Sequence, residues 1–361
     1  MMKPIACKAL PSSYRILLAQ KGFSLVELLV ALFISLLLSM AVYQVFDIAQ
    51  RTNRLQAAIT QLQDSGRFAL QTMAQDLRQT AFNGGCRNTA FHLEENSGLN
   101  GEFSPLMGWD SPSVTGFEDE LASPVAMGNV VAFRGVALTE LSMSEESVIV
   151  ESSNTLRLNL SEPLDTRFQD NVLLVQAGNR CDVFLNTSPQ ADRFAKGLEA
   201  SDLTRNKLPD GSDWGITAGS EVVSVSLLDN AVYYLGSDPV SNTPSLMYLD
   251  INQAAPTNQV VANHVAAMRL AYLEDGETSY QSAGDINDWQ DVSALRISLL
   301  MQSEQNVRSA QEAEALAGEF GIGNFRGLTG TALENFTGIF SDNPQRLYQV
   351  FTTTVQLRNR L

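Results

Sequence analysis

Hydrophobic residues are concentrated in one long run near the start of the chain. The stretch 23–46 reads FSLVELLVALFISLLLSMAVYQVF and contains one charged residue, Glu27. At about 1.5 Å per residue, a helix of this length reaches about 36 Å, whereas the hydrocarbon core of a bilayer is about 30 Å thick. The run therefore predicts a membrane-spanning helix over 23–46.

The apolar pattern becomes amphipathic after this run without stopping. No proline interrupts the chain between Pro11 and Pro105, and Asn83 followed by two glycines supplies a stop signal. One helix over 23–82 is expected, with its second half lying on the rest of the protein and with Gly66 weakening or bending it. The predicted contact face repeats at steps of three and four residues: Ile48, Thr52, Leu55, Ile59, Leu62, Gly66, Ala69, Met73 and Leu77.

Short β-rich runs, separated by turn-forming residues, follow residue 86. One long helix followed by many strands predicts an α+β fold in which the helix packs on an antiparallel β-sheet head over 83–361. No linker composition divides this region, so a single head is expected. The expected strands are 130–134, 147–151, 155–160, 172–176, 182–185, 222–228, 232–235, 245–250, 267–273, 293–301 and 349–357.

The charges around the apolar run predict its orientation. Residues 1–22 carry four basic side chains and no acidic one, so the positive-inside rule places the N-terminus in the cytoplasm and the rest outside. A cleaved secretory signal would need a shorter apolar region and a small-residue site, which 47–56 do not offer. A plain signal anchor is the stronger alternative, but it leaves Glu27 unexplained, since an ionised carboxylate at mid-membrane costs about 2.5 to 3.5 kcal/mol.

The segment KGFSLVELLVAL, Lys21 to Leu32, resembles the processing and assembly motif of type IV prepilins. In that family a membrane peptidase, the prepilin peptidase, cuts after the glycine, here Gly22. The new first residue, here Phe23, is N-methylated, and the hydrophobic segment stays on the mature protein. The resemblance therefore implies a leader over 1–22 and a retained helix.

Cutting after Gly22 also has a consequence that follows from helix geometry. The new α-amine on Phe23 stands four residues before Glu27 and therefore on the same helix face. The amine neutralises the buried acid within one subunit or, as the resemblance implies, between neighbours during assembly. Glu27 is then expected to set the register of the assembled helices.

The head extends the resemblance. Segments 172–187, 264–275 and 288–303, and the ending RLYQVFTTTVQLRNR over 346–360, are similar to minor pilins of the PilW type. Membership implies that the chain primes type IV pilus assembly with other minor pilins, the major pilin and the assembly platform. It also implies a place at the pilus tip, with a tip adhesin as a further partner, and a role in adhesion, twitching motility or DNA uptake.

The same resemblance predicts where the protein resides. It implies a single pass through the inner membrane, with the N-terminus cytoplasmic and the head periplasmic, before the subunit enters the surface pilus. Two alternatives stay open. One is a minor pseudopilin of a type II secretion system, which shares the N-terminal features, and the other is a membrane-anchored periplasmic binding protein or enzyme.

Composition excludes several function classes. With 40 acidic against 24 basic residues and a net charge of -16, a general nucleic-acid-coating role is disfavoured. Two histidines and three cysteines exclude a histidine-rich metal site and a four-cysteine zinc site. The sequence contains no G-x-S-x-G, H-E-x-x-H or P-loop motif, so no catalytic or cofactor-binding residue is assigned and no enzyme is expected.

The cysteines predict one cross-link in the exported form. Cys7 leaves with the leader, so Cys86 and Cys181 remain as an even pair in an oxidising periplasm. We expect a disulfide between them, and two unpaired buried thiols are the alternative.

One loop carries candidate metal ligands. Residues 274–291 contain Asp275, Asp285, Asn287 and Asp288, whose oxygen atoms suit calcium. The loop is not an EF-hand, and a solvated, turn-rich connection between strands is the favoured interpretation. No other cofactor is expected.

Overall fold

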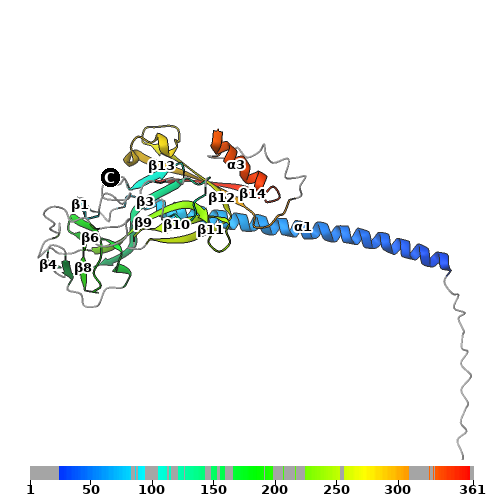
Figure 1. The fold of residues 1–361 in the computed structure, drawn as a ribbon, viewed down its shortest axis with the longest axis horizontal. Helices are drawn as coiled ribbons and strands as arrows, with labels where there is room; N and C mark the ends of the chain where they lie inside the picture. The colour runs from blue at the N-terminus through cyan, green and yellow to red at the C-terminus, as the bar shows by residue number, and fades with distance from the viewer. Residues whose placement is uncertain are drawn as a thin grey trace, which may run out of the picture. The chain divides into compact units, whose positions relative to one another are not determined.

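A computed structural model describes residues 24–82, 86, 88–93, 105–111, 114, 121–125, 127–142, 148–152, 155–158, 166–190, 192–197, 206, 216, 224–252, 256–308, 325, 328 and 330–357. Its first element is helix α1, Leu25–Arg78, and a β-rich head follows (Figure 1). The chain divides between Arg54 and Leu55 into two compact units, which are described separately.

The end of α1 is fixed by the head. The N–H of Ala81 donates to the carbonyl of Arg134 at 2.8 Å, and Ala81 has a φ of 66°. A left-handed residue after a helix is usually glycine, yet here an alanine makes the turn. The helix therefore ends at Arg78, a few residues earlier than predicted, while the expected stop signal at 83–85 lies outside the described residues.

The largest sheet of the head has the strand order β1-β7-β6-β9-β10-β11, and β3 joins β9 while β2 pairs with β3. Its described pairs are antiparallel except for β1 and β7, which run parallel. Its strands are β1 (Asn88–Phe91), β2 (Leu106–Trp109), β3 (Val130–Ser142), β6 (Val172–Ala177), β7 (Arg180–Leu185), β9 (Ser224–Ser237), β10 (Pro244–Asp250) and β11 (Thr257–Asn263).

Two smaller antiparallel sheets complete the head. The first has the order β12-β13-β14, with β12 (Val265–Glu274), β13 (Val292–Gln302) and β14 (Tyr348–Gln356). The second consists of β4 (Val148–Ser152), β5 (Thr155–Leu158) and β8 (Arg193–Ala195). The described helices of the head are α3 (Gly330–Asp342) and the short turns η2 (Thr166–Phe168), η3 (Ala283–Asp285) and η4 (Trp289–Asp291).

The second half of α1 forms part of the main core. Its buried side chains form one cluster with the largest sheet and with β12–β14, and this arrangement confirms the predicted α+β fold with a helix on a β-sheet head. The cluster includes Leu62, Met73, Leu77, Phe133, Tyr233, Ile297 and Leu299. The predicted contact face is confirmed from Leu62 to Leu77. It is wrong at its start, because Ile48 is 63% exposed and Leu55 is 37% exposed.

Several elements differ from the sequence-based expectation. The two runs at 222–228 and 232–235 form one strand, β9, and helix α3 was not expected, nor were β1, β2, β8 and β11. No break separates these two runs, because the backbones of Asp229 and Asn230 pair with Gly135 and Arg134 of β3, and their side chains accept hydrogen bonds from neighbouring strands. Arg134 Nε donates to Asn230 Oδ1 at 3.1 Å, and the hydroxyl of Tyr248 donates to Asp229 at 2.8 Å.

Candidate functional site

The start of α1 is closed by a reciprocal pair of hydrogen bonds. The N–H of Val26 donates to Ser24 Oγ at 3.3 Å, and the N–H of Ser24 donates to Glu27 Oε2 at 3.0 Å. This is a capping box, in which Ser and a Glu three residues later satisfy amides that the helix leaves free. The Ser24-x-x-Glu27 spacing is visible in the sequence, where the expected role of Glu27 is charge pairing alone.

The capping box places α1 directly after the predicted cleavage site. Gly22 and Phe23 lie outside the described residues, and the helix begins at Leu25. A chain starting at Phe23 would therefore be helical almost from its first residue. Glu27 is exposed, and its carboxylate already lies on the helix end that carries the partial positive charge of the backbone.

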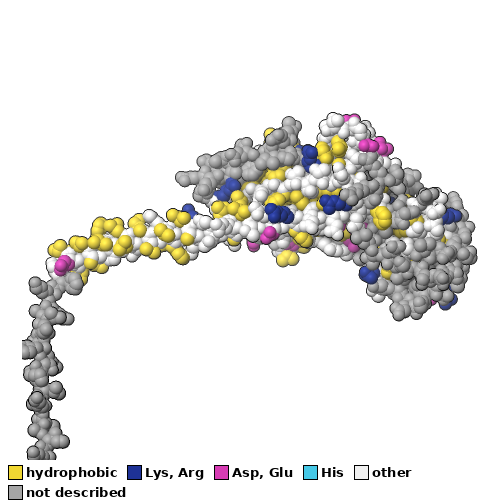
Figure 2. Space-filling view, turned by 180° about the vertical axis from the view of Figure 1, so that it is seen from behind, with side chains coloured by type: hydrophobic (Ala, Val, Ile, Leu, Met, Phe, Trp, Pro, Cys, Tyr) yellow, Lys and Arg dark blue, Asp and Glu magenta, His cyan; other side chains and the backbone are white. Residues whose placement is uncertain are grey.

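The first unit exposes an unusually long apolar surface. From Leu25 to Ile48 the large hydrophobic side chains of α1 are at least half exposed, and Figure 2 shows them covering this part of the helix. Within the described residues, α1 is the one helix long and apolar enough to cross a membrane. Burying such a surface from water is strongly favourable, at roughly 25 cal/mol per Å², so it requires a bilayer or neighbouring helices.

In the second unit, α1 approaches β14 closely at Gly66. A Cβ added to Gly66 would lie 2.6 Å from Cδ2 of Phe351, which is closer than real Cβ contacts. Gly66 therefore provides the space in which the Phe351 ring contacts the helix. Gly66 lies within the continuous helix Leu25–Arg78, and its contact with Phe351 accounts for a glycine at this position.

Two carboxylates lie near each other where α1 meets the largest sheet. Asp76 of α1 accepts a hydrogen bond of 2.5 Å from the hydroxyl of Tyr233, and Asp229 of β9 accepts one from Tyr248. Burial raises the pKa of Asp76, and burial together with the charges of Asp76 and Asp250 raises the pKa of Asp229 to about 6. The tyrosine hydrogen bonds oppose both shifts because they favour the ionised carboxylates.

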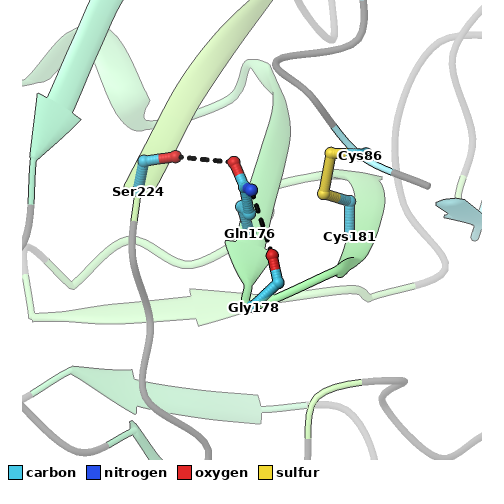
Figure 3. Close-up of a disulfide and its surroundings, with 5 residues drawn as sticks. All are labelled: Cys86, Gln176, Gly178, Cys181 and Ser224. Carbon is cyan, nitrogen blue, oxygen red and sulfur yellow. Dashed lines mark hydrogen bonds between the residues drawn. A yellow bond between two sulfur atoms is a disulfide. The ribbon is translucent and has the colours of Figure 1, made fainter. Parts of the chain in front are cut away.

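The expected disulfide is present in the head. Cys86 and Cys181 are bonded, with their Cα atoms 6.0 Å apart, and the bond ties the segment after α1 to β7 (Figure 3). Beside it, Gln176 Nε2 donates to the carbonyl of Gly178 at 3.1 Å, and the hydroxyl of Ser224 donates to Gln176 Oε1 at 3.3 Å. Both cysteines are buried, so the cross-link is part of the core rather than a surface feature.

A buried polar cluster follows the disulfide along β7. Asp182 Oδ1 lies 3.1 Å from His92 Nε2, and Lys196 Nζ lies 3.4 Å from His92 Nδ1. The second carboxylate oxygen of Asp182 accepts the N–H of Ile216 at 3.1 Å. All three ionisable side chains are buried, and their contacts join the end of β1 to β7 and to the segment after β8.

The candidate calcium residues take part in hydrogen bonds within the loop 274–291. The amides of Asn287 and Asp288 both donate to Glu274 Oε1 at 3.1 Å, and Asp285 accepts a hydrogen bond from Ser282. Asp288 caps η4 by accepting the N–H of Gln290, while the N–H of Asp275 donates to the Asp291 carbonyl. Across the described residues, no group of three or more His, Cys, Asp or Glu side chains is arranged to hold a metal ion.

Comparison with protein families gave two matches. A family described as type IV pilus-assembly protein W matches residues 232–359, a range that begins within β9 and extends three residues past the end of β14. A prokaryotic N-terminal methylation motif matches residues 17–43, which include the predicted cleavage site and the apolar start of α1. No curated protein and no solved structure gave a significant match.

Proposed function

Because the chain is a type IV pilus minor pilin of the PilW type, a membrane-anchored subunit that works with other pilins in pilus assembly, we propose that cleavage after Gly22 activates it. Prepilin peptidase removes 1–22, and Phe23 becomes the methylated first residue. The N-terminus lies on the cytoplasmic side of the inner membrane and the head in the periplasm until extraction into the filament. The methylation motif over 17–43 supports this proposal.

The exposed apolar half of α1 is the observation that carries the proposal. Its large hydrophobic side chains are exposed and not covered by any part of the chain that the structure describes, and the capping box holds Glu27 at the end where a new amine would appear. In the membrane this surface contacts lipid, and in the filament it contacts helices of neighbouring subunits. Glu27 then pairs with the Phe23 amine of its own or a neighbouring subunit and sets the axial register.

The head gives the subunit its place in the assembly. We propose that it joins other minor pilins in a complex that primes the pilus, remains at the tip near an adhesin, and contributes to adhesion, twitching motility or DNA uptake. The PilW family is a structural component of the pilus, and the proposal assigns the head no catalytic role and no cofactor. The match over 232–359 favours the pilus over a type II secretion system.

Substitution at Glu27 tests the proposal. Glu27→Ala removes the charge and the cap, whereas Glu27→Gln keeps a hydrogen-bond acceptor for the Ser24 amide and removes only the charge. Both variants should insert into the membrane normally, and both should be depleted at least tenfold from sheared surface fibres. Normal incorporation of Glu27→Gln would contradict the charge-pairing role, and absence of the unmodified protein from every fibre preparation would contradict pilus incorporation.

A further inference from the structure

The largest sheet contains a hollow at the point where β9 changes its neighbour. Along one edge, β9 pairs with β6 up to Leu227 and with β10 from Ala231 onward. Within the described residues no strand pairs with 228–230 on that edge, while their other edge pairs with β3. A hollow of about 610 Å³ opens at this gap, a volume typical of small-molecule sites.

The walls of this hollow are held in place by hydrogen bonds within the chain. The side-chain oxygen of Asn252 accepts the N–H of Asn230 at 2.8 Å, and its carbonyl accepts the N–H of Val172 at 2.9 Å. These two bonds fasten β9 and the start of β6 to the segment after β10. The side-chain amide of Asn171 donates to two carbonyls of the turn before it, at 2.8 and 3.2 Å. The hollow is therefore formed before a ligand enters, as most small-molecule sites are.

Several polar groups in the lining retain hydrogen-bonding capacity. Asp229 Oδ1 accepts the hydroxyl of Tyr248 at 2.8 Å. Asp250 Oδ1 accepts the N–H of Asn252 at 2.9 Å and its side-chain amide at 3.0 Å. The second oxygen of each carboxylate, and the side chain of Gln169, make no hydrogen bond to the part of the chain that the structure describes. The hollow thus offers acceptors for the O–H or N–H groups of a ligand.

The lining also limits the class of ligand. Its charged members are Asp170, Asp229, Asp250 and Arg167, and Leu227 and Tyr248 add apolar surface. The acids repel an anion, and an apolar ligand would take water from the carboxylates without replacing its hydrogen bonds. An organic cation would meet the guanidinium and leave the apolar surface unused, and the described residues contain no group arranged to hold a metal ion. A neutral saccharide avoids these conflicts, because its hydroxyls donate and accept hydrogen bonds while its C–H faces pack on apolar side chains.

We propose that this hollow at the junction of β6, β9 and β10 binds a small neutral saccharide. Hydroxyls of the sugar donate to the second oxygens of Asp229 and Asp250, and another accepts from the Gln169 amide. A C–H face of the sugar lies against Leu227 and Tyr248. The inference goes beyond the proposed function, since it assigns the head a ligand site that neither membrane insertion nor pilus entry requires.

The test uses the full chain in a detergent without a sugar headgroup, because such a headgroup would compete for the hollow. Lactose, maltose and N,N′-diacetylchitobiose serve as probes in saturation-transfer difference NMR. At least one of them should show saturable transfer to its ring protons, with an affinity that changes less than about twofold between low and high salt. Inorganic phosphate and cadaverine, an anion and a cation, should bind at least tenfold more weakly than the best disaccharide.

Two substitutions in the hollow and two outside it locate the site. Asp250→Asn keeps an oxygen for Asn252 and replaces the second oxygen with an amide, and Gln169→Ala removes a donor to the sugar. Each should weaken binding of the best disaccharide at least tenfold. Asp64→Asn and Gln290→Ala are the matched controls, since both residues are exposed and neither lines the hollow. Both controls should bind the disaccharide as the unsubstituted chain does.

Hydrogen exchange of the unsubstituted chain locates the site without a substitution. The best disaccharide should slow exchange at 166–171 and 227–230 and leave β14, 348–356, unchanged. Melting temperatures show whether the two hollow variants are folded. If either variant is unfolded, the exchange measurement decides in its place.

Any one of four results would overturn the proposal. The first is no saturable transfer to any of the three disaccharides, and the second is phosphate or cadaverine binding as tightly as the best of them. The third is exchange protection confined to other segments, and the fourth is normal binding by both hollow variants in their folded state. None of these results depends on whether the protein enters a pilus, so failure here is distinguishable from failure of the proposed function.

Discussion

From Leu25 to Arg54, helix α1 leaves its large apolar side chains exposed, whereas from Leu55 to Arg78 it buries one face in the core of the head. Both halves belong to one helix. The partner of the second half is therefore encoded in the same chain, while the partner of the first half must be a bilayer or other subunits. The difference shows that the second stretch of α1 belongs to the core of the head, whereas the first stretch is left exposed for contacts outside the chain.

The acids of the two halves show the same division. Glu27 is exposed and accepts a hydrogen bond from the amide of Ser24, so it remains available to a cation outside the chain. Asp76 is held by the hydroxyl of Tyr233 within the head, where burial raises its pKa. The carboxylate in the first half is thus exposed at the helix start, and the one in the second half belongs to the core.

The largest expected difference comes from truncating one methionine in each half. Met73 is fully buried, so Met73→Ala should lower the free energy of unfolding of the head by about 2 to 5 kcal/mol. Met40 is 62% exposed, so Met40→Ala should change the free energy of unfolding of the head by no more than about 0.5 kcal/mol. Urea unfolding followed by tryptophan fluorescence measures both, and equal effects would contradict the division.

A smaller effect is expected where α1 meets β14. Gly66→Ala forces a methyl group against the Phe351 ring and should cost about 1 to 3 kcal/mol, even though alanine is the better helix former. Gly338→Ala in α3 is the matched control, because nothing lies within 4 Å of the added Cβ, and it should be neutral or stabilising. Phe351→Leu combined with Gly66→Ala should recover part of the loss. If the double variant is no more stable than Gly66→Ala alone, the Phe351 ring is not what the added methyl group clashes with.

The pH dependence of the head should follow Asp229. Its pKa is raised to about 6 by burial and by Asp76 and Asp250, above the ordinary value of about 4 in an unfolded chain. The folded state therefore holds this proton more tightly, and its stabilising contribution is lost as the pH rises from about 4 to about 6. Asp229→Asn should flatten this part of the stability profile, measured as melting temperature against pH. An unchanged profile would show that Asp229 is not responsible.

The smallest effect concerns Tyr272, whose side chain lies in the cluster that the second half of α1 joins. Its hydroxyl is buried and has no hydrogen-bond partner among the described residues. Tyr272→Phe should therefore change the free energy of unfolding by about 0.5 kcal/mol or less, or stabilise the head. Tyr233→Phe, which loses the hydrogen bond to Asp76, should cost about 1 kcal/mol or more. Equal losses would indicate an unseen partner of Tyr272.

The sequence predicted the features whose cause is local. The apolar run follows directly from composition, and the stripe from Leu62 to Leu77 follows from helix periodicity. The Cys86–Cys181 bond joins residues 95 positions apart and was predictable for another reason, because these two cysteines are the pair outside the expected leader 1–22. The capping box of Ser24 and Glu27 is equally local, and the Ser-x-x-Glu spacing is the signal that predicts it.

The elements that were missed depend on distant residues. Strand β9 continues through Asp229 and Asn230 because Tyr248 and Arg134 supply hydrogen bonds from other strands. Helix α3 buries Phe336 alone among its residues, and β11 is mostly exposed, so neither shows a clear apolar period. The exposure of Ile48 was also unpredictable, since an amphipathic pattern does not say how far along the helix the head extends.

The central claim is that the apolar half of α1 stays on the mature protein with a new amine four residues before Glu27. Mass spectrometry of the N-terminal peptide of the protein, isolated from sheared surface fibres, tests this directly. The account predicts a peptide that begins with N-methylated Phe23 and continues through Glu27. A peptide that begins at Met1, or one that begins beyond residue 46, would contradict it.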